Sequence, residues 1–270
     1  YMSNFVENGQ NGYPGENNKE SVFEIQYGEN ITSGWESGYK TDAHRNNPFF
    51  APTGWHNIAP TQKLKEMFEP TSEEDPANAA GFAHDPRREV TLFEEGDTIY
   101  FKTGDPMAWK ASKHLATASE GIGWKKYFQP TGDISNLPQG TNNIRVIRFS
   151  DVLLMYAEAE YNLGNTTENS PWQGGLWALN YVRARVGMSG IDELTPEAIM
   201  HERACELGLE GVRFHDLVRW TLRDNPWTDF AEEINTSSSF KSGFRKGKHE
   251  FLPIPQSEID INEMEQNPGY

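Results

Sequence analysis

Residues 202–220 read ERACELGLEGVRFHDLVRW, and this stretch says most about the fold. Glu202, Glu206 and Glu210 recur at every fourth position, so in a helix they share one face. Two such carboxylates could act as acid and base in a hydrolase. Alternatively, an arginine–carboxylate network could tie the helix to loops and neighbouring helices, with Arg203, Arg213 and Arg219 nearby in the sequence. We expect the arginine–carboxylate network.

Helical periodicity extends over the region from residue 143 onward. A first helix is expected to begin at Ser150 and to end at Gly164, because serine caps helix starts and glycine caps helix ends. A second helix is predicted over 176–186, forming an antiparallel hairpin of tetratricopeptide type with the first. A third is predicted from Thr195 to about Trp220. The apolar face of the first helix is expected to comprise Val152, Tyr156, Ala159 and Leu163.

The first half of the chain reads differently. Residues 1–143 are crowded with Gly, Pro, Asn and aromatic residues, which interrupt regular structure every few positions. Short strands are predicted over 22–27 and 97–102, and a short helix over 61–68. We therefore expect a loop-rich, aromatic-rich segment with ligand-binding loops over 1–143 and a helical tetratricopeptide-like region over 144–270, together forming one structural unit.

Charge and composition exclude several classes of protein. The 270 residues include 40 acidic and 24 basic side chains, a net charge of -16, which disfavours nucleic acid as a partner. With one cysteine, Cys205, the chain cannot form an intrachain disulfide. No run of 18 apolar residues is present, and the first residues have none of the features of a signal peptide.

Catalytic and metal-binding motifs are not found in the sequence. The start of a zinc motif at His201-Glu202 lacks its second histidine, because Cys205 occupies that position. We expect Cys205 to be a buried, unreactive thiol. The sequence therefore predicts no catalytic residue, no metal site and no cofactor, and it does not indicate calcium.

The aromatic segment 35–56 is the candidate ligand site. A sugar has an apolar face and a rim of hydroxyl groups, so its site needs exposed aromatic rings beside polar side chains. Loop-like sequence of this composition supplies both, although the same aromatics could instead pin long loops to the core. The predicted ligand-binding residues are Trp35, Tyr39, Arg45, Asn46 and Trp55.

The other aromatic residues have a lower rank as ligand contacts. Trp172 falls in the loop of the predicted helical hairpin and could contact a partner. Trp177 and Trp220 fall within predicted helices and are expected in the core, and Trp124 and Tyr127 are expected to pack.

Several sequence blocks occur in a fixed order along the chain. They include FEIQY at 23–27, SDVLLMYAEA at 150–159, ALNYVRAR at 178–185, and the block at 202–220. The segments at 60–69 and 85–87 lie between the first two, and the C-terminal motifs FLPIP at 251–255 and QNPGY at 266–270 follow the last. These blocks and their order resemble the SusD/RagB family over roughly 20–270.

The resemblance implies a mainly α fold with long loops and short strands, a SusD-like scaffold related to tetratricopeptide repeats. It implies a non-enzymatic protein that binds oligosaccharides at the cell surface and delivers them to a SusC-like TonB-dependent transporter. Members are outer-membrane lipoproteins, and we expect the lipid anchor and the N-terminal half of the unit to lie outside this chain. The alternatives are a glycoside hydrolase and a tetratricopeptide-type scaffold that binds protein or peptide.

Overall fold

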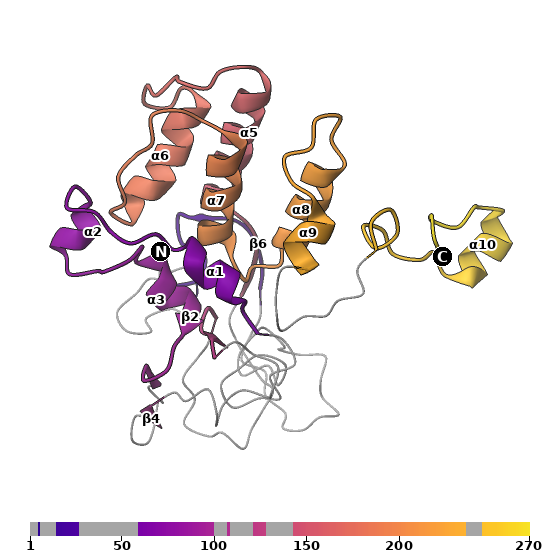
Figure 1. Cartoon of the computed structure of the whole chain (residues 1–270), viewed down its shortest axis with the longest axis horizontal. Coiled ribbons are helices and arrows are strands. Elements are labelled where there is room, and N and C mark those ends of the chain that lie inside the picture. The colour runs from indigo at the N-terminus through magenta and orange to yellow at the C-terminus, as the bar shows by residue number, and fades with distance from the viewer. Residues whose placement is uncertain are drawn as a thin grey trace. The chain divides into compact units, whose positions relative to one another are not determined.

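The computed structural model of the chain describes residue 5 and residues 15–26, 59–99, 107–108, 121–127, 143–235 and 245–270. The chain divides into two compact units, Tyr1–Gly211 and Val212–Tyr270, and each is considered by itself. The helices of the first unit are α1 (Gln62–Met67), α2 (Pro76–Ala79), α3 (Arg87–Thr91), α5 (Phe149–Asn162), α6 (Gly175–Arg185) and α7 (Pro196–Leu207) (Figure 1).

Three two-stranded sheets accompany these helices in the described residues. Their strands are β1 (Ser21–Ile25), β2 (Leu92–Phe93), β3 (Thr98–Ile99), β4 (Met107–Ala108), β5 (Gly123–Trp124) and β6 (Ile144–Arg148). All three pairs are antiparallel: β1 with β6, β2 with β5 and β3 with β4. The β1–β6 pair joins residues more than 100 positions apart and leads directly into α5, so it anchors the start of the helical region.

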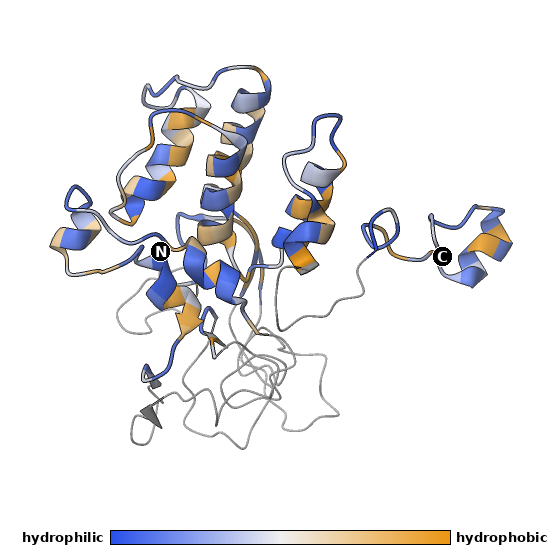
Figure 2. Ribbon diagram, in the orientation of Figure 1, coloured by the Kyte–Doolittle hydropathy of each residue, from blue (hydrophilic) through white to orange (hydrophobic). Residues whose placement is uncertain are grey.

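The helices α5, α6 and α7 pack against one another in the first unit (Figure 1). Ala157 of α5 and Ala178 of α6 are both fully buried, and these small side chains allow the close approach of the two helices. Each of the three helices carries hydrophobic and hydrophilic positions, as expected for a layer with one packed face (Figure 2). The predicted helical hairpin is present, with its connecting loop at 163–174.

Local capping explains where these helices begin and end. Gly164 and Gly187 follow α5 and α6 in the left-handed conformation, with φ of 83° and 79°, as glycine allows without strain. Thr195 caps α7 by accepting a hydrogen bond from the amide of Ala198 at 3.1 Å. Ser150, in contrast, is not the cap of α5: the helix begins at Phe149, and the Ser150 hydroxyl donates to the carboxylate of Glu20.

The third predicted helix is wrong in its length. It ends at Leu207, and a separate helix α8 (Arg213–Thr221) begins after a turn. Gly208 leaves the helix at ψ 133°, and Leu209 is left-handed at φ 66°. A side chain at position 208 would lie 2.7 Å from the carbonyl oxygen of Ala204, so the exit depends on glycine.

The expected apolar face of α5 is also wrong as a core face. Tyr156 is 37% exposed and Leu163 is 74% exposed, although both lie on the predicted stripe. Leu153, Leu154 and Ala157 are buried instead. The buried side of α5 is therefore rotated away from the predicted apolar face, which points outward.

A small hydrophobic core lies where α1, β2 and α7 meet. Phe68, Leu92, Ile122 and Cys205 are each at most 2% exposed, and Leu64, Met67 and Leu209 pack against them. The second unit contains α8, α9 (Phe230–Asn235) and α10 (Gln256–Asn262), with Trp220 fully buried. Within the described residues, no helix is long and apolar enough to span a bilayer.

The observed fold class is mainly α, with short strands and connecting loops, as the sequence predicted. The predicted strand at 22–27 corresponds to β1 and the predicted helix at 61–68 to α1. The proposed division at residue 143 stays a prediction, because much of the first half lies outside the described residues.

Candidate functional site

The predicted ligand-binding residues lie outside the described part of the chain. All of them fall between residues 27 and 58, so their role stays a prediction; they are Trp35, Tyr39, Arg45, Asn46 and Trp55. The predicted arginine–carboxylate network, in contrast, lies within the described residues.

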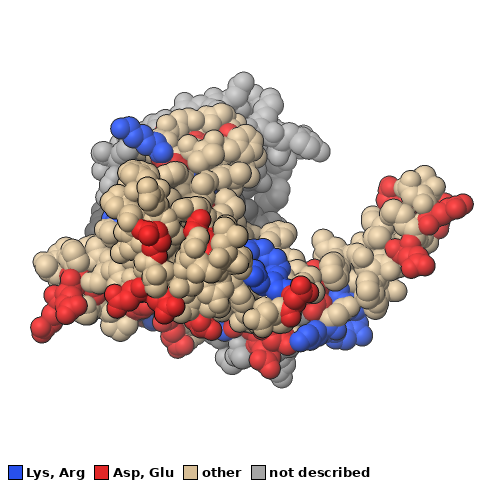
Figure 3. All heavy atoms as spheres, turned by 90° about the horizontal axis from the view of Figure 1, so that it is seen from above, with Lys and Arg blue, Asp and Glu red and all other residues tan. Residues whose placement is uncertain are grey.

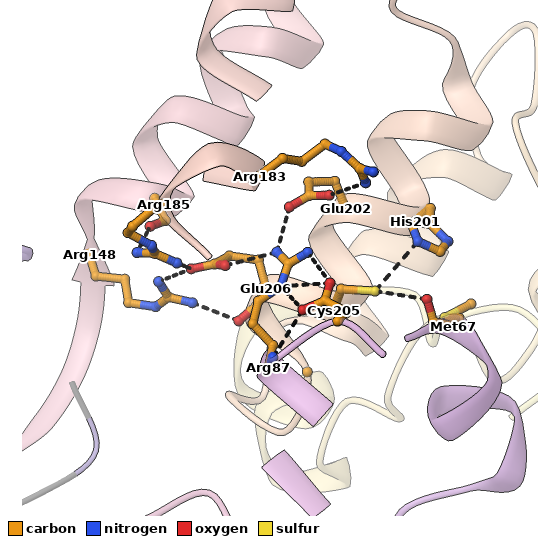
Figure 4. A network of polar contacts seen from close by, with 12 residues as sticks. Met67, Arg87, Arg148, Arg183, Arg185, His201, Glu202, Cys205 and Glu206 are labelled. Atoms are coloured by element: carbon orange, nitrogen blue, oxygen red, sulfur yellow. Dashed lines mark hydrogen bonds and ion pairs between the residues drawn. The ribbon is translucent and has the colours of Figure 1, made fainter. Parts of the chain in front are cut away.

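Glu206 of α7 is the centre of this network and is fully buried (Figure 4). Its Oε2 accepts a hydrogen bond from Arg87 Nη1 at 3.0 Å, and its Oε1 accepts one from Arg185 Nη2 at 2.5 Å. Arg148 also donates to Oε1 and reaches the main-chain oxygen of Glu206 at 2.7 Å. One carboxylate therefore holds guanidinium groups from α3, from the end of β6 and from the end of α6.

Glu202, one turn earlier on α7, extends the network toward α6. Its two oxygens accept from Arg87 Nη1 at 2.5 Å and from Arg183 Nη1 at 3.2 Å. The other side of the Arg87 guanidinium, Nε and Nη2, pairs with Asp85 at distances between 2.5 and 3.1 Å. Since Arg87 and Glu202 are at most 1% exposed, each buried charge is matched by an opposite one.

The turn after α7 brings the third glutamate into the same network. Glu210 Oε2 accepts from Arg148 Nε at 2.8 Å, and its Oε1 accepts from Lys126 Nζ at 2.8 Å. Lys126 also donates to the carbonyl of Gly208 at 2.7 Å, so a fully buried ammonium group satisfies the end of the helix. The break at Gly208 thereby gives Lys126 its partners.

The charge state of these glutamates argues against acid catalysis. Burial alone would raise the pKa of Glu206, but Arg148, Arg185 and Arg87 hold it well below its ordinary range. Glu210 shows the same balance, with Arg148 and Lys126 lowering its pKa against burial. A general acid of a glycosidase needs a raised pKa. Glu206 and Glu210 stay ionised, and they bind side chains from four other segments of the chain.

Cys205 is a buried thiol, as the sequence predicted. It is fully buried, its Sγ donates to the carbonyl of Met67 at 3.2 Å, and burial raises its pKa well above the ordinary value. His201 Nε2 lies 3.6 Å from the sulfur (Figure 4). Among the residues that the structure describes, no three His, Cys, Asp or Glu side chains are close enough to hold a metal ion.

A cavity of about 270 Å³ lies between α6, α7 and the segment after α1. His201 Nε2 lies 3.2 Å from one oxygen of Glu69, and Arg183 Nη2 lies 3.1 Å from the other. Charged groups of both signs thus neutralise one another on its wall. Its lining comprises Glu69, Leu179, Arg183, Ile191, Glu197, Ala198 and His201.

We expect Glu69→Gln to make the protein less sensitive to acid. The hydrogen bond from His201 lowers the pKa of Glu69 most; partial burial opposes it and Arg183 adds to it, so the pKa falls from 4.5 to about 2. A lowered carboxyl pKa stabilises the fold above pH 4.5, and this stability is lost as the pH falls through 2. The Glu69 side chain is 42% exposed, so solvent screens its interactions. We therefore expect its ionised form to contribute about 1 kcal/mol to the free energy of unfolding.

Urea unfolding followed by circular dichroism at pH 7 and pH 3 measures this effect. The difference in unfolding free energy between the wild type and Glu69→Gln should shrink at the lower pH. Glu66→Gln, which changes an exposed carboxylate of α1, is the control. An equal difference at both pH values would show that the ionised form of Glu69 does not stabilise the fold more than the protonated form does.

The aromatic residues outside 27–58 divide into buried and exposed sets. Tyr127 and Trp220 are buried, as expected, and the Trp124 indole donates to the carbonyl of Lys126 at 2.8 Å. Trp172 is 67% exposed. Trp177 is partly exposed, so its expected place in the core is wrong: the residue points away from the buried face of α6.

Comparison with known proteins gives the same fold. A SusD-like protein from Bacteroides fragilis has a TM-score of 0.67 at 22% identity, covering 100% of this chain and 57% of that one. A laminarin-binding SusD-like protein has a TM-score of 0.53 at 26% identity, covering 94% and 51%. Surface glycan-binding protein A from Bacteroides thetaiotaomicron, in complex with laminarihexaose, has a TM-score of 0.59 at 22% identity, covering 99% and 54%. The chain spans about half the length of these proteins.

Sequence comparison identifies the family. SusD-like protein P25 from Formosa agariphila is 31% identical over 140 residues, which are 48% of this chain and 25% of that protein. The family model described as the SusD family matches residues 19–270, nearly the whole chain. The chain therefore belongs to the SusD family.

Proposed function

We propose that this chain binds oligosaccharides at the cell surface without catalysis and delivers them to a SusC-like TonB-dependent transporter. Membership of the SusD family over residues 19–270 carries the proposal. The similarity to a laminarin-binding SusD-like protein supports a glycan as the ligand.

The chemistry of the described residues supports binding rather than hydrolysis. Glu202 and Glu206, the carboxylates that sequence spacing offers as a catalytic pair, are buried among guanidinium groups and lie out of reach of a polysaccharide. The pKa of Glu206 is lowered, the opposite of what a general acid needs. On the face drawn in Figure 3, acidic side chains are spread widely, which favours neutral over anionic glycans.

The cellular setting follows from the same family. We propose a lipoprotein at the outer face of the outer membrane, held by a lipid anchor, with the α5–α6 hairpin as part of a tetratricopeptide-like scaffold. The protein would cover the transporter and release its ligand into it. Co-purification of a tagged chain with the transporter from detergent-solubilised membranes tests this step.

An affinity screen tests the proposed glycan binding. We expect the wild type to be retained by at least one neutral polysaccharide, with laminarin as the first probe. The double variant Trp35→Ala/Tyr39→Ala should bind at least about tenfold more weakly, because loss of stacked aromatic rings removes more than about 1 kcal/mol. Phe251→Ala, which removes a 40% exposed ring of the second unit, is the matched control.

Three other results would redirect the assignment. Equal retention of both proteins would keep glycan binding but move the site away from 35–39. Release of shorter sugars from the polysaccharide would establish a hydrolase. If the folded wild type is retained by no glycan but captures peptides, the peptide-binding scaffold becomes the function.

A further inference from the structure

Three aromatic side chains form a compact cluster at the end of the α5–α6 hairpin. The ring centroids of Trp172 and Trp177 lie 4.8 Å apart, those of Trp177 and Tyr181 5.2 Å, and those of Trp172 and Tyr181 5.9 Å. These distances describe a nearly equilateral triangle. The rings are tilted by 37–49° to one another.

The cluster is open to solvent although its rings touch. Trp172 is 67% exposed and Tyr181 is 43% exposed, whereas aromatic side chains of this size are mostly buried in folded proteins. Trp177 and Tyr181 are four residues apart on α6, on the side opposite to the buried Leu179 and Val182. The rings therefore do not belong to the core of the hairpin.

The loop before α6 holds Trp172 in this exposed position. Trp172 has a φ of 64°, a left-handed conformation that costs free energy for a bulky residue. Gly174 is left-handed as well, and a side chain there would lie 2.1 Å from the carbonyl oxygen of Glu168. The Gly174 amide donates to the Tyr156 hydroxyl at 3.2 Å, and the Trp177 amide donates to the Glu168 carbonyl at 3.3 Å. These hydrogen bonds hold the backbone between Trp172 and the start of α6.

The composition of the loop indicates the chemistry of the ligand. Residues 164–174 read GNTTENSPWQG, with Glu168 as their one charged residue. A cationic site for phosphate or another anion would need lysine or arginine, and this loop has none. Its amide and hydroxyl side chains are neutral donors and acceptors, which suit sugar hydroxyls, while the tilted rings suit the apolar face of a pyranose.

We propose that Trp172, Trp177 and Tyr181 form a carbohydrate-binding platform for the end or a short stretch of a neutral oligosaccharide. This inference rests on the proposed function and adds to it a site outside residues 35–55. A platform on the hairpin gives a long glycan a second point of attachment, which slows its dissociation through multivalency.

Tryptophan indole NMR and calorimetry test the platform directly. The probes are laminarihexaose and the hexaoses of cellulose, starch and xylan. The indole N–H resonances of Trp172 and Trp177, assigned with Trp172→Phe and Trp177→Phe, are expected to shift on addition of the hexaose that binds. Trp172→Ala/Tyr181→Ala should raise Kd about tenfold. Leu163→Ala, which removes a 74% exposed aliphatic side chain beside the same loop, should leave Kd unchanged.

The possible outcomes separate this inference from the proposed function. Wild-type binding without indole shifts, and with an unchanged Kd in Trp172→Ala/Tyr181→Ala, overturns the platform and leaves the proposed function standing. Absence of binding to every hexaose and to laminarin by the folded wild type overturns both. Loss of transporter co-purification in this variant, with unchanged sugar affinity, assigns the cluster to a protein partner and overturns the platform.

Discussion

Glu206→Ala is expected to lower the free energy of unfolding by about 3–5 kcal/mol, because it removes a fully buried carboxylate that three guanidinium groups share. Arg87, Arg148 and Arg185 all donate to the Glu206 carboxylate. Arg87 and Arg148 are at most 1% exposed, so water cannot replace the lost acceptor. Arg87 keeps Glu202 and Asp85, and Arg148 keeps Glu210, so the cost comes from buried positive charge that is only partly neutralised.

Urea unfolding followed by far-ultraviolet circular dichroism measures this loss, and Glu160→Ala is the matched control. Glu160 lies on α5, where its carboxylate accepts only an exposed hydrogen bond from Asn165 among the contacts described. We expect this control to change stability by less than about 0.5 kcal/mol. A loss below about 1 kcal/mol in Glu206→Ala would show that the guanidinium groups find other partners and that the network is not a central support of the fold.

The glutamate half of this network could be predicted from spacing, and the arginine half could not. Glu202 and Glu206 lie four residues apart on one helix, so their common face follows from helix geometry. Arg87 reaches them across 115 and 119 positions of sequence, and no local pattern encodes such a contact. The sequence also does not predict that Lys126 belongs to this network, because lysine side chains are mostly found at the protein surface.

Local sequence does not predict the turn after α7 either. Glycine within a helical pattern costs only about 1 kcal/mol relative to alanine, so Gly208 and Gly211 did not outweigh the periodicity around them. The structure shows what favours the break. The Gly208 carbonyl and the Glu210 carboxylate both accept hydrogen bonds from Lys126, which a continuous helix would withdraw.

Burial explains the other differences between the predicted and the observed structure. Periodicity finds an apolar stripe but does not say which stripe is covered, and on α5 the outward stripe carries Tyr156 and Leu163. The position of Trp177 within a predicted helix favours a place in the core, but the side chain is partly exposed. Its spacing from Tyr181, together with Trp172 just before the helix, could have indicated an aromatic surface.

These observations separate the support of the fold from the proposed binding surface. The charged network is buried, neutralised and drawn from distant segments, which makes it rigid and chemically inert. The aromatic cluster is exposed and carried by one loop and one helix. Substitutions in the first should change stability, and substitutions in the second should change ligand affinity with little effect on stability. This division is what a non-catalytic binding protein requires.

Trp220→Ala is expected to destabilise the second unit by about 3–5 kcal/mol, because it removes the largest fully buried side chain of α8 and leaves a cavity. The ring centroids of Trp220 and Trp227 lie 5.9 Å apart in a stacked arrangement. The guanidinium groups of Arg213 and Arg219 lie over the Trp220 ring, 5.5 and 4.9 Å from its centroid. The Trp227 amide also donates to the Trp220 carbonyl at 3.2 Å. Loss of the indole therefore removes ring stacking and cation–π contacts together with the buried area.

Hydrogen exchange measured by mass spectrometry locates this effect where a global unfolding curve cannot. In Trp220→Ala, amide protection should fall across α8 and α9, while α5 and α6 keep wild-type protection because they belong to the other compact unit. Leu222→Ala, at the 53% exposed position just after α8, should leave protection unchanged. Wild-type protection of α8 in Trp220→Ala would mean that the indole does not hold this unit together. An equal loss in α5 and α6 would mean that the two units unfold as one.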